Sequence, residues 1–427
     1  MNHPSLSRRN FVKSASVIGA ASFSPLPVLR GQQHAPSRKL RVGVMGLKRG
    51  LAHIRGFQAV PNVEIAYVCD VDKERAAAGG KLAAEGQEKP AKVVGDFRRI
   101  LDDDSVDILS IATPNFWQAP ATILGCQAGK HVYVEKPGSY DPQEGEWMVE
   151  AARKYDRKVQ LGTQRRSYAS MIEGMKRLHE GVIGKVLYAR TWYRNNRGSI
   201  GHGSETAVPK NLDYDLWQGP APERPYRDNL VHYNWHWVWH YGGGELINNG
   251  VHALDLARWG LGVNYPTRVT YLGGRYHYDD DQETPDTGTA QFDFGDVGAT
   301  WEGSSCLKRN EDQLAFCTFY GEGGTMAFDF AGYKIYDLEG VLLGENEGTP
   351  GDVPHFQNIC DAIRDDVPLT QEIAEGQKST HWCHLGNIAY RTQSVLDVSP
   401  DTGRIIGNAK AQRLWKRSYR RGWKPKV

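Results

Sequence analysis

A regular alternation of strand-like and helix-like segments after Pro36 constrains the fold of this chain most. Short apolar runs occur at 40–45, 63–69, 106–112 and 131–134, and helix-like stretches separate them. One of these stretches opens with Asp141-Pro142 and carries Glu144 in its first turn, which is a typical helix start. Such alternation predicts an α/β fold, a doubly wound parallel sheet that binds its ligand at the carboxyl ends of the strands.

The pattern changes from about residue 186 onward. Strand-like segments follow one another at 267–272, 289–294, 298–301, 314–320 and 325–330, with helical stretches near 248–261, 355–364 and 379–396. Because 427 residues are too many for one ordinary core, we expect two domains. We assign 37–160 to a Rossmann domain and 161–427 to a C-terminal α/β domain with an open, mainly antiparallel sheet.

Residues 1–36 have the pattern of an export signal. The run Ser7-Arg8-Arg9-Asn10-Phe11-Val12-Lys13 precedes a mild apolar stretch and then Pro25 and Pro27. This pattern is typical of a twin-arginine signal, which a receptor reads and which is not a membrane anchor. We therefore expect a periplasmic or otherwise exported protein; the alternative is a plain basic arm.

Charge and cysteine usage exclude several classes of protein. The chain has 52 Lys and Arg against 50 Asp and Glu, and both ends are basic, so the long middle is acidic and we expect no nucleic-acid partner. We interpret the basic segment 404–427 as a solvated end. No apolar run reaches the roughly 18 residues of a membrane span. The six cysteines show no C-x-x-C pair, which indicates neither a zinc site nor a disulfide framework.

The turn after the first strand is a candidate nucleotide-binding loop. In Gly46-Leu47-Lys48-Arg49-Gly50, small residues would let backbone N–H groups approach a pyrophosphate. Asp70 ends the second strand, where a carboxylate can hold a ribose 2′-hydroxyl and would repel a 2′-phosphate, so NAD is favoured over NADP. The usual G-x-G-x-x-G is not intact, because Lys48 stands in place of its second glycine or one residue is deleted.

Several segments resemble the Gfo/Idh/MocA family of sugar and polyol oxidoreductases. The matching segments are VGVMGL (42–47), VCD (68–70), ATP (112–114), YVEKP (133–137), LGTQRRS (161–167), LDYDLWQGPAP (212–222) and GGGELINNGVHALDLARWG (242–260). The resemblance covers about 40–425. It implies a Rossmann domain, a second α/β domain whose open sheet often makes oligomer contacts, and hence a homo-oligomer.

The resemblance also implies roles for single residues. Lys136 matches the EKP lysine between nicotinamide and the substrate hydroxyl, and His252 matches the catalytic histidine. Asn248 stands where many relatives have Asp, so it can bind substrate but cannot accept a proton. The expected cofactor-binding residues are Gly43, Gly46, Leu47, Lys48, Arg49, Gly50, Asp70, Thr113, Pro114, Asn115, Trp117, Glu135, Lys136 and Gln164. Trp117 lies in a segment that departs from the family pattern, and it either shapes the pocket or only packs.

An aromatic run at 232–241 is a candidate substrate surface. His232, His236 and His240 are spaced four apart, which raises the question of a metal site, but tryptophans rather than acidic residues separate them. We expect no metal. Substrate contact and simple packing both remain open. The candidate substrate residues are Arg165, Trp235, His236 and His240.

Three functions fit these patterns. The first is an NAD(P)-dependent oxidoreductase that acts on a secondary hydroxyl of a sugar, glycoside or polyol. The second is a redox-neutral glycosidase or lyase with tightly bound NAD, a chemistry known in the resembling family. The third is a sugar-binding protein without activity, which Lys136 and His252 argue against.

Overall fold

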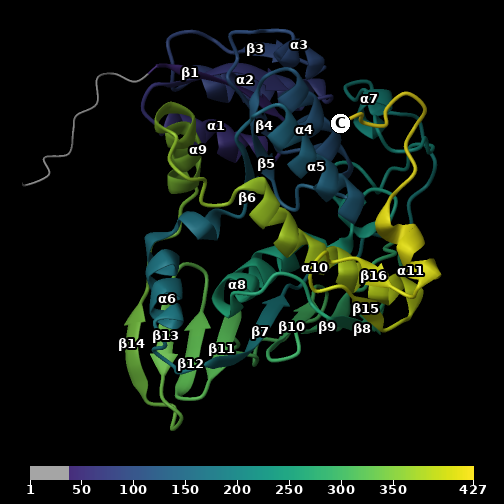
Figure 1. Cartoon of the computed structure of the whole chain (residues 1–427). Helices are drawn as coiled ribbons and strands as arrows, with labels where there is room; N and C mark the ends of the chain where they lie inside the picture. The colour runs from purple at the N-terminus through teal and green to yellow at the C-terminus, as the bar shows by residue number, and fades with distance from the viewer. Residues whose placement is uncertain (1–37) are drawn as a thin grey trace, which may run out of the picture. The chain divides into compact units, whose positions relative to one another are not determined.

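The computed structural model describes residues 38–427, and the expected export signal lies outside them. Two sheets organise the described chain: a parallel sheet with its helices, and a larger sheet built from later residues (Figure 1). This arrangement confirms the predicted fold class.

The first sheet has six parallel strands in the order β3-β2-β1-β4-β5-β6. Its strands are β1 (Leu40–Met45), β2 (Val63–Cys69), β3 (Lys92–Val94), β4 (Ile108–Ile111), β5 (His131–Glu135) and β6 (Val159–Gly162). Its helices are α1 (Gly50–Gln58), α2 (Lys73–Ala84), α3 (Arg98–Leu101), α4 (Asn115–Gln127) and α5 (Pro142–Lys154). The strand order reverses between β1 and β4, and this switch point is where such sheets bind ligands.

The second sheet has ten strands in the order β14-β13-β12-β11-β7-β10-β9-β8-β15-β16. Only the β7–β10 pair is parallel among the strands of this described sheet. The strands are β7 (Val186–Arg194), β8 (Arg268–Gly274), β9 (Thr287–Asp293), β10 (Gly298–Ser304), β11 (Cys317–Gly321), β12 (Gly324–Phe328), β13 (Tyr333–Tyr336), β14 (Leu342–Asn346), β15 (Leu396–Val398) and β16 (Ile405–Ile406).

Helices of the later residues pack on both sheets. They are α6 (Ala169–His179), α7 (Tyr214–Gln218), α8 (Val251–Leu261), α9 (Val353–Asp365), α10 (Ile373–Thr392) and α11 (Ala409–Gln412), with short turns at Gln164–Ser167, Asn234–Trp237, Leu246–Gly250 and Arg413–Trp415. α8 and α10 contribute to the core of the ten-stranded sheet, whereas α9 places Phe356 against Phe57 and Tyr133 of the parallel-sheet domain. Helix α9 therefore contributes to the core of the parallel-sheet domain. The predicted domain boundaries stay a prediction.

The basic C-terminal segment is only partly a solvated end, because most of its Lys and Arg residues are exposed but Arg417 and Trp423 pack against the parallel-sheet domain. The Arg417 side chain is 7% exposed and its Nη2 lies 2.7 Å from Oε1 of Glu144 on α5. The Trp423 ring packs edge-on against Trp117 of α4, with centroids 5.3 Å apart. The acids that pair with the tail are far away in sequence, so a local count of charges could not find them.

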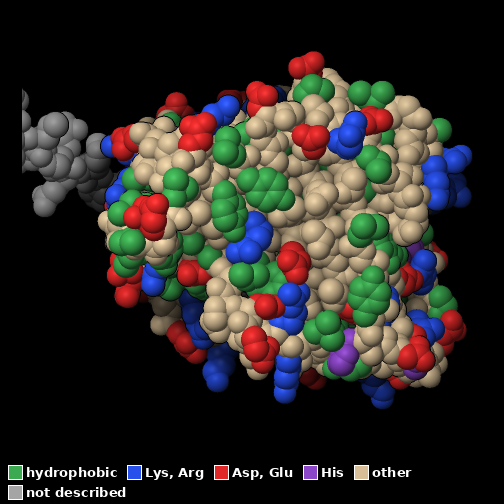
Figure 2. Space-filling model, turned by 90° about the horizontal axis from the view of Figure 1, so that it is seen from below, with side chains coloured by type: hydrophobic (Ala, Val, Ile, Leu, Met, Phe, Trp, Pro, Cys, Tyr) green, Lys and Arg blue, Asp and Glu red, His purple; other side chains and the backbone are tan. Residues whose placement is uncertain are grey.

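None of the helices described is both long and apolar enough to cross a membrane. On the face that Figure 2 shows, hydrophobic, acidic and basic side chains are interspersed. The homo-oligomer that the resemblance implies stays a prediction.

Candidate functional site

A cavity of about 1250 Å³ lies at the carboxyl ends of the parallel strands. One part is lined by the loop between β1 and α1, by Asp70 after β2 and by Thr113 and Pro114 after β4. The other part is lined by Lys136, His252 and residues of the later chain. The cavity is therefore lined both by residues at the switch point of the parallel sheet and by residues from the second half of the chain.

The loop after β1 can only be built with glycine at Gly46. Its φ is +87°, and a Cβ there would lie 2.7 Å from the carbonyl carbon of Ala112. The backbone N–H groups of Leu47 and Asp72 donate to the two carboxylate oxygens of Asp70, at 2.6 and 2.9 Å. The Asp70 side chain is therefore held between the loop and the start of α2. Burial raises the pKa of Asp70, although both hydrogen bonds act in the opposite direction.

Glu135, at the end of β5, is the centre of a buried ionic network. Its Oε1 accepts hydrogen bonds from Arg49 Nε at 2.9 Å and Gln164 Nε2 at 3.1 Å, and lies 3.2 Å from His53 Nε2. Burial opposes ionisation of Glu135, but the charge of Arg49, the contact with His53 and the charge of Lys136 together outweigh it and hold the pKa of Glu135 well below its usual range. Arg49 also pairs with Asp352 at 2.6 Å. This network fixes the turn that carries Lys136.

Lys136 and Asn248 contact each other directly. The Lys136 Nζ donates to the Asn248 backbone oxygen at 2.7 Å and to its side-chain Oδ1 at 3.0 Å. Burial lowers the pKa of Lys136, and the neighbouring Glu135 charge opposes that shift. Burial, with the charges of Arg165 and Lys136, lowers the pKa of His252 well below its usual value. Its Nδ1 has no hydrogen-bond partner within residues 38–427, so a neutral imidazole is available in the cavity.

The segment before His252 is not a regular α-helix. Leu246–Gly250 forms a π-helical turn, and α8 begins only at Val251. Asn248 therefore lies in the π-helical turn and His252 in the α-helix, and both residues line the cavity. π-turns within helices are frequent at functional sites.

The later chain adds an aromatic wall. Trp235 and His236 stack with ring centroids 3.6 Å apart, and both line the cavity. Burial lowers the pKa of His236 to about 3, which keeps its ring neutral. Further aromatic lining residues, which the sequence did not single out, are Tyr168, Trp192, Tyr233, Phe316 and Phe330.

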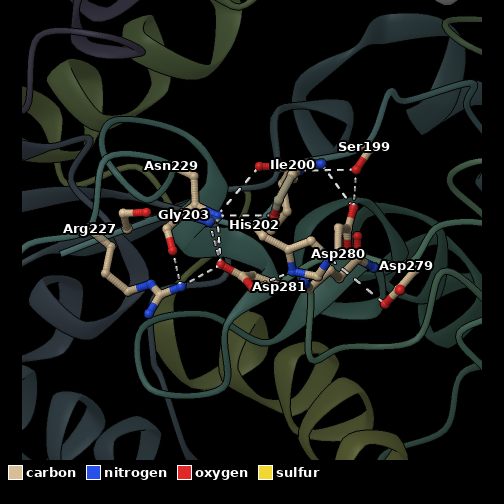
Figure 3. Close-up of polar contacts among 12 residues, drawn as sticks. Ser199, Ile200, His202, Gly203, Arg227, Asn229, Asp279, Asp280 and Asp281 are labelled. Atoms are coloured by element: carbon tan, nitrogen blue, oxygen red, sulfur yellow. Dashed lines mark hydrogen bonds and ion pairs between the residues drawn. The ribbon is translucent and has the colours of Figure 1, made fainter.

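A polar cluster fixes the irregular segment that leads to this wall. Figure 3 shows Asp281 receiving hydrogen bonds from Gly203 N at 2.8 Å, Asn229 Nδ2 at 2.9 Å and Arg227 at 2.8 Å. Burial acts against ionisation of Asp281, but these donors outweigh it and lower its pKa. Because residues 227–229 precede the aromatic run by only a few positions, the cluster anchors one end of the wall.

The three spaced histidines have separate partners. His232 Nε2 lies 2.8 Å from Asp72, His236 Nδ1 lies 2.6 Å from the Tyr233 carbonyl oxygen, and His240 Nε2 lies 2.8 Å from the Pro222 carbonyl oxygen. In the part of the chain with described coordinates, no group of three or more His, Cys, Asp or Glu side chains could hold a metal ion.

Most of the predicted site residues share the cavity. The predicted residues that line it are Gly46, Leu47, Lys48, Arg49, Asp70, Thr113, Pro114, Asn115, Trp117, Glu135, Lys136, Gln164, Arg165, Trp235, His236, Asn248 and His252. Gly43, Gly50 and His240 do not line it, and their expected contacts stay predictions. A Cβ on Gly43 would meet Ile100 at 2.4 Å, and one on Gly50 would meet Val44 at 3.0 Å, so both glycines serve close packing.

Two other side-chain interpretations are resolved by the structure. Trp117 is 3% exposed and donates from Nε1 to the Trp217 carbonyl oxygen at 2.9 Å, so it packs as well as lining the cavity. Asp255 pairs with Arg166 at 2.8 Å and not with Arg258 of its own helix.

The residues present fit a dinucleotide. The Gly46 turn leaves no room for a side chain, and an anchored Asp70 carboxylate lines the same cavity at the end of the neighbouring strand. Gly46 and Asp70 therefore suit the pyrophosphate and ribose portions respectively.

Comparisons with known proteins agree with this site. Residues 40–163 match the family model described as the oxidoreductase family, NAD-binding Rossmann fold, and residues 190–425 match that of its C-terminal alpha/beta domain. A similar curated protein is a glycosyl hydrolase family 109 protein of Shewanella pealeana, 25% identical over 209 residues. That match covers 44% of this chain and 46% of the relative, so the chain spans about half the length of the curated relatives it matches.

Solved structures share the fold over most of the chain. An aldose-aldose oxidoreductase from Caulobacter crescentus, complexed with glycerol, has a TM-score of 0.67 at 20% identity, covering 84% of this chain and 100% of that one. A levoglucosan dehydrogenase in complex with NADH has a TM-score of 0.66 at 17% identity, covering 84% and 99%. Since both family models match and one of them alone spans more than half of the chain, this protein belongs to the Gfo/Idh/MocA family of oxidoreductases.

Proposed function

We propose that this protein is an NAD-dependent oxidoreductase that acts on a secondary hydroxyl group of a sugar, glycoside or polyol. The observation that carries the proposal is the placement of Lys136, Asn248 and His252 in one cavity with the Gly46 loop and Asp70. The sugar-acting oxidoreductases among the solved structures with this fold support the substrate class.

The chemistry of the site follows from its own side chains. NAD, when bound, accepts a hydride from the carbon that carries the hydroxyl group. Oxidation of an alcohol must also remove the hydroxyl proton, and a general base does this best when its pKa is near the working pH. Burial moves the pKa of Lys136 downward, toward the working pH, which suits Lys136 as the base, and the neutral His252 can form a hydrogen bond with the reacting hydroxyl group. Asn248 orients Lys136 through two hydrogen bonds and takes no proton itself.

A redox-neutral glycoside cleavage is the second candidate. It is favoured by the similarity to a glycosyl hydrolase family 109 protein. In such a reaction hydride is taken from the sugar and later returned, so no net redox change occurs. An exported enzyme would suit this chemistry, since a tightly held nucleotide needs no soluble pool.

One experiment separates the two candidates. Protein purified from an export-competent host is denatured, and the released nucleotide is identified by mass spectrometry. The intact protein is then given simple sugars and aryl glycosides while NADH absorbance and aglycone release are followed. Net NADH formation supports the oxidoreductase, and aglycone release without NADH supports the cleavage. Protein that neither retains nor binds NAD would contradict both.

Replacing Asp70 by Ala is expected to weaken NAD binding by about 1–3 kcal/mol, the scale of a lost hydrogen bond to a charged group. NADP binding should weaken less, because the carboxylate that would repel a 2′-phosphate is removed. Titration calorimetry with both nucleotides measures the two effects. Asp102→Ala, on the same domain and outside the cavity, is the matched control. Unchanged NAD affinity in the Asp70 variant would mean that the ribose is held elsewhere.

We further propose export through the twin-arginine pathway, from the Ser7–Lys13 pattern. Changing Arg8 and Arg9 together to Lys is expected to retain the protein in the cytoplasm, because the receptor reads the arginine pair. Cell fractionation measures this, with Arg38→Lys as a control outside the pattern. Undiminished export of the double variant would contradict the assignment.

A further inference from the structure

Arg165 is a cation in the cavity wall that has no acidic partner of its own. Its guanidinium lies 4.6 Å from the ring centroid of Phe316 and 5.1 Å from that of Phe330. Within residues 38–427 it forms no ion pair with a carboxylate, and its Nε has no hydrogen-bond partner. Burial lowers the pKa of Arg165, which is the signature of a charge that the protein itself leaves uncompensated.

The two residues beside Arg165, by contrast, both have polar partners within the protein. Gln164 donates to Glu135 at 3.1 Å, away from Arg165. Arg166 forms a two-pronged contact with Asp255, from Nε at 2.8 Å and from Nη2 at 2.9 Å. Gln164 and Arg165 both line the cavity, whereas Arg166 does not, and of these two lining residues only Arg165 carries a charge.

The acids nearest in electrostatic effect are engaged elsewhere. Asp352 and Asp255 both act on Arg165 through space. Asp352 is paired with Arg49 at 2.6 Å, and Asp255 is paired with Arg166. Arg165 and Lys136 each affect the pKa of His252 more strongly than the acids Glu135 and Asp255 do.

We propose that Arg165 binds a carboxylate of the substrate, so that the preferred carbohydrate is a sugar acid such as a glycuronate. This inference rests on the proposed function and deepens it. A guanidinium presents planar paired donors that match a carboxylate, and the flanking aromatic rings exclude water and strengthen that contact. A phosphate group carries nearly twice the charge, which one guanidinium between two rings would leave half compensated.

The test compares sugars that differ only at one carbon. NADH-loaded protein is titrated calorimetrically with glucose and glucuronate, galactose and galacturonate, and with glucose 6-phosphate. In at least one pair the acid is expected to bind at least tenfold more tightly than the neutral sugar. In Arg165→Gln that preference is expected to fall by about 10- to 100-fold, the scale of hydrogen bonds to a charged group.

Arg190→Gln is the matched control. Arg190 also lies over an aromatic ring, at 6.0 Å from the Tyr320 centroid, and its Nε also has no partner among the described residues, but it does not line the cavity. The Arg190→Gln variant should prefer sugar acids over neutral sugars as strongly as the wild type does. Equal affinities within every pair, tightest binding of the phosphate, or a preference that survives in Arg165→Gln would overturn the inference. If neutral sugars are oxidised and no acid is preferred in any pair, the inference is overturned while the proposed function stands, whereas wild-type protein that does not bind NAD would remove that function.

Discussion

Replacing His252 or Lys136 by Ala is expected to slow the single-turnover reduction of bound NAD by about 10²- to 10⁴-fold, the usual contribution of general acid–base catalysis. The reason is that these side chains bring titratable nitrogen atoms to the cavity that also contains Asp70 and the Gly46 loop. Stopped-flow absorbance at saturating substrate measures the rate. His179→Ala, on an exposed histidine outside the cavity, should leave it unchanged.

The same measurement over a range of pH tests how Asn248 acts. In Asn248→Asp a carboxylate would stand beside Nζ of Lys136, where it favours the charged ammonium and raises the lysine pKa. A base with a higher pKa is neutral only at higher pH. The rising limb of the rate profile should therefore move to higher pH. A His252→Ala enzyme with the wild-type rate, or an unmoved profile in Asn248→Asp, would remove that residue from the mechanism.

The parallel domain could be predicted from the sequence because its signals are local. The strands β1, β2, β4 and β5 coincide with the predicted apolar runs, and the turns after β1 and β2 carry Gly46 and Asp70 in sequence order, whereas β3 and β6 were not predicted. The π-turn at Leu246–Gly250 could not be predicted, since the residues of a π-turn have the same apolar pattern as an α-helix. The matching segments placed Lys136, Asn248 and His252 in one region, but not the hydrogen bond that joins the first two.

The sequence patterns could not identify the residues that contact Arg49 and Arg165. Asp352 contacts Arg49 from 303 positions later in the chain, and Phe316 and Phe330 follow Arg165 by 151 and 165 positions. Nothing in a local window marks such residues, because only the packing of α9 and the ten-stranded sheet brings them to the cavity. The predicted contacts at Gly43, Gly50 and His240 stay predictions. In the structure Gly43 and Gly50 allow close packing, and the ring of His240 lies beside the Pro222 carbonyl oxygen.

The second large expected effect is a loss of stability when the C-terminal segment is changed. Arg417→Met is expected to reduce the free energy of unfolding by about 3–5 kcal/mol, because it leaves a buried carboxylate without its cation. Glu144 is 0% exposed in its side chain, and its Oε1 accepts from Arg417 Nε at 2.7 Å and from the Tyr419 hydroxyl at 2.6 Å. Urea unfolding followed by tryptophan fluorescence measures the loss. Arg421→Met, an exposed position in the same tail, should change stability by less than about 0.5 kcal/mol.

A second variant separates the buried charge from simple packing. In Arg417→Met with Glu144→Gln, the buried Glu144 carboxylate is no longer left without its cation, so a large part of the stability should return.

The Arg417→Met substitution should also affect the cavity, because Arg417 Nη2 donates to the Phe116 carbonyl oxygen at 2.7 Å and Trp423 packs on Trp117. These contacts hold the first turn of α4, whose residues line the cavity beside the nucleotide loop. We therefore expect NAD to bind more weakly to Arg417→Met below its unfolding transition. A variant as stable as the wild type would show that the tail only rests on α4 and α5.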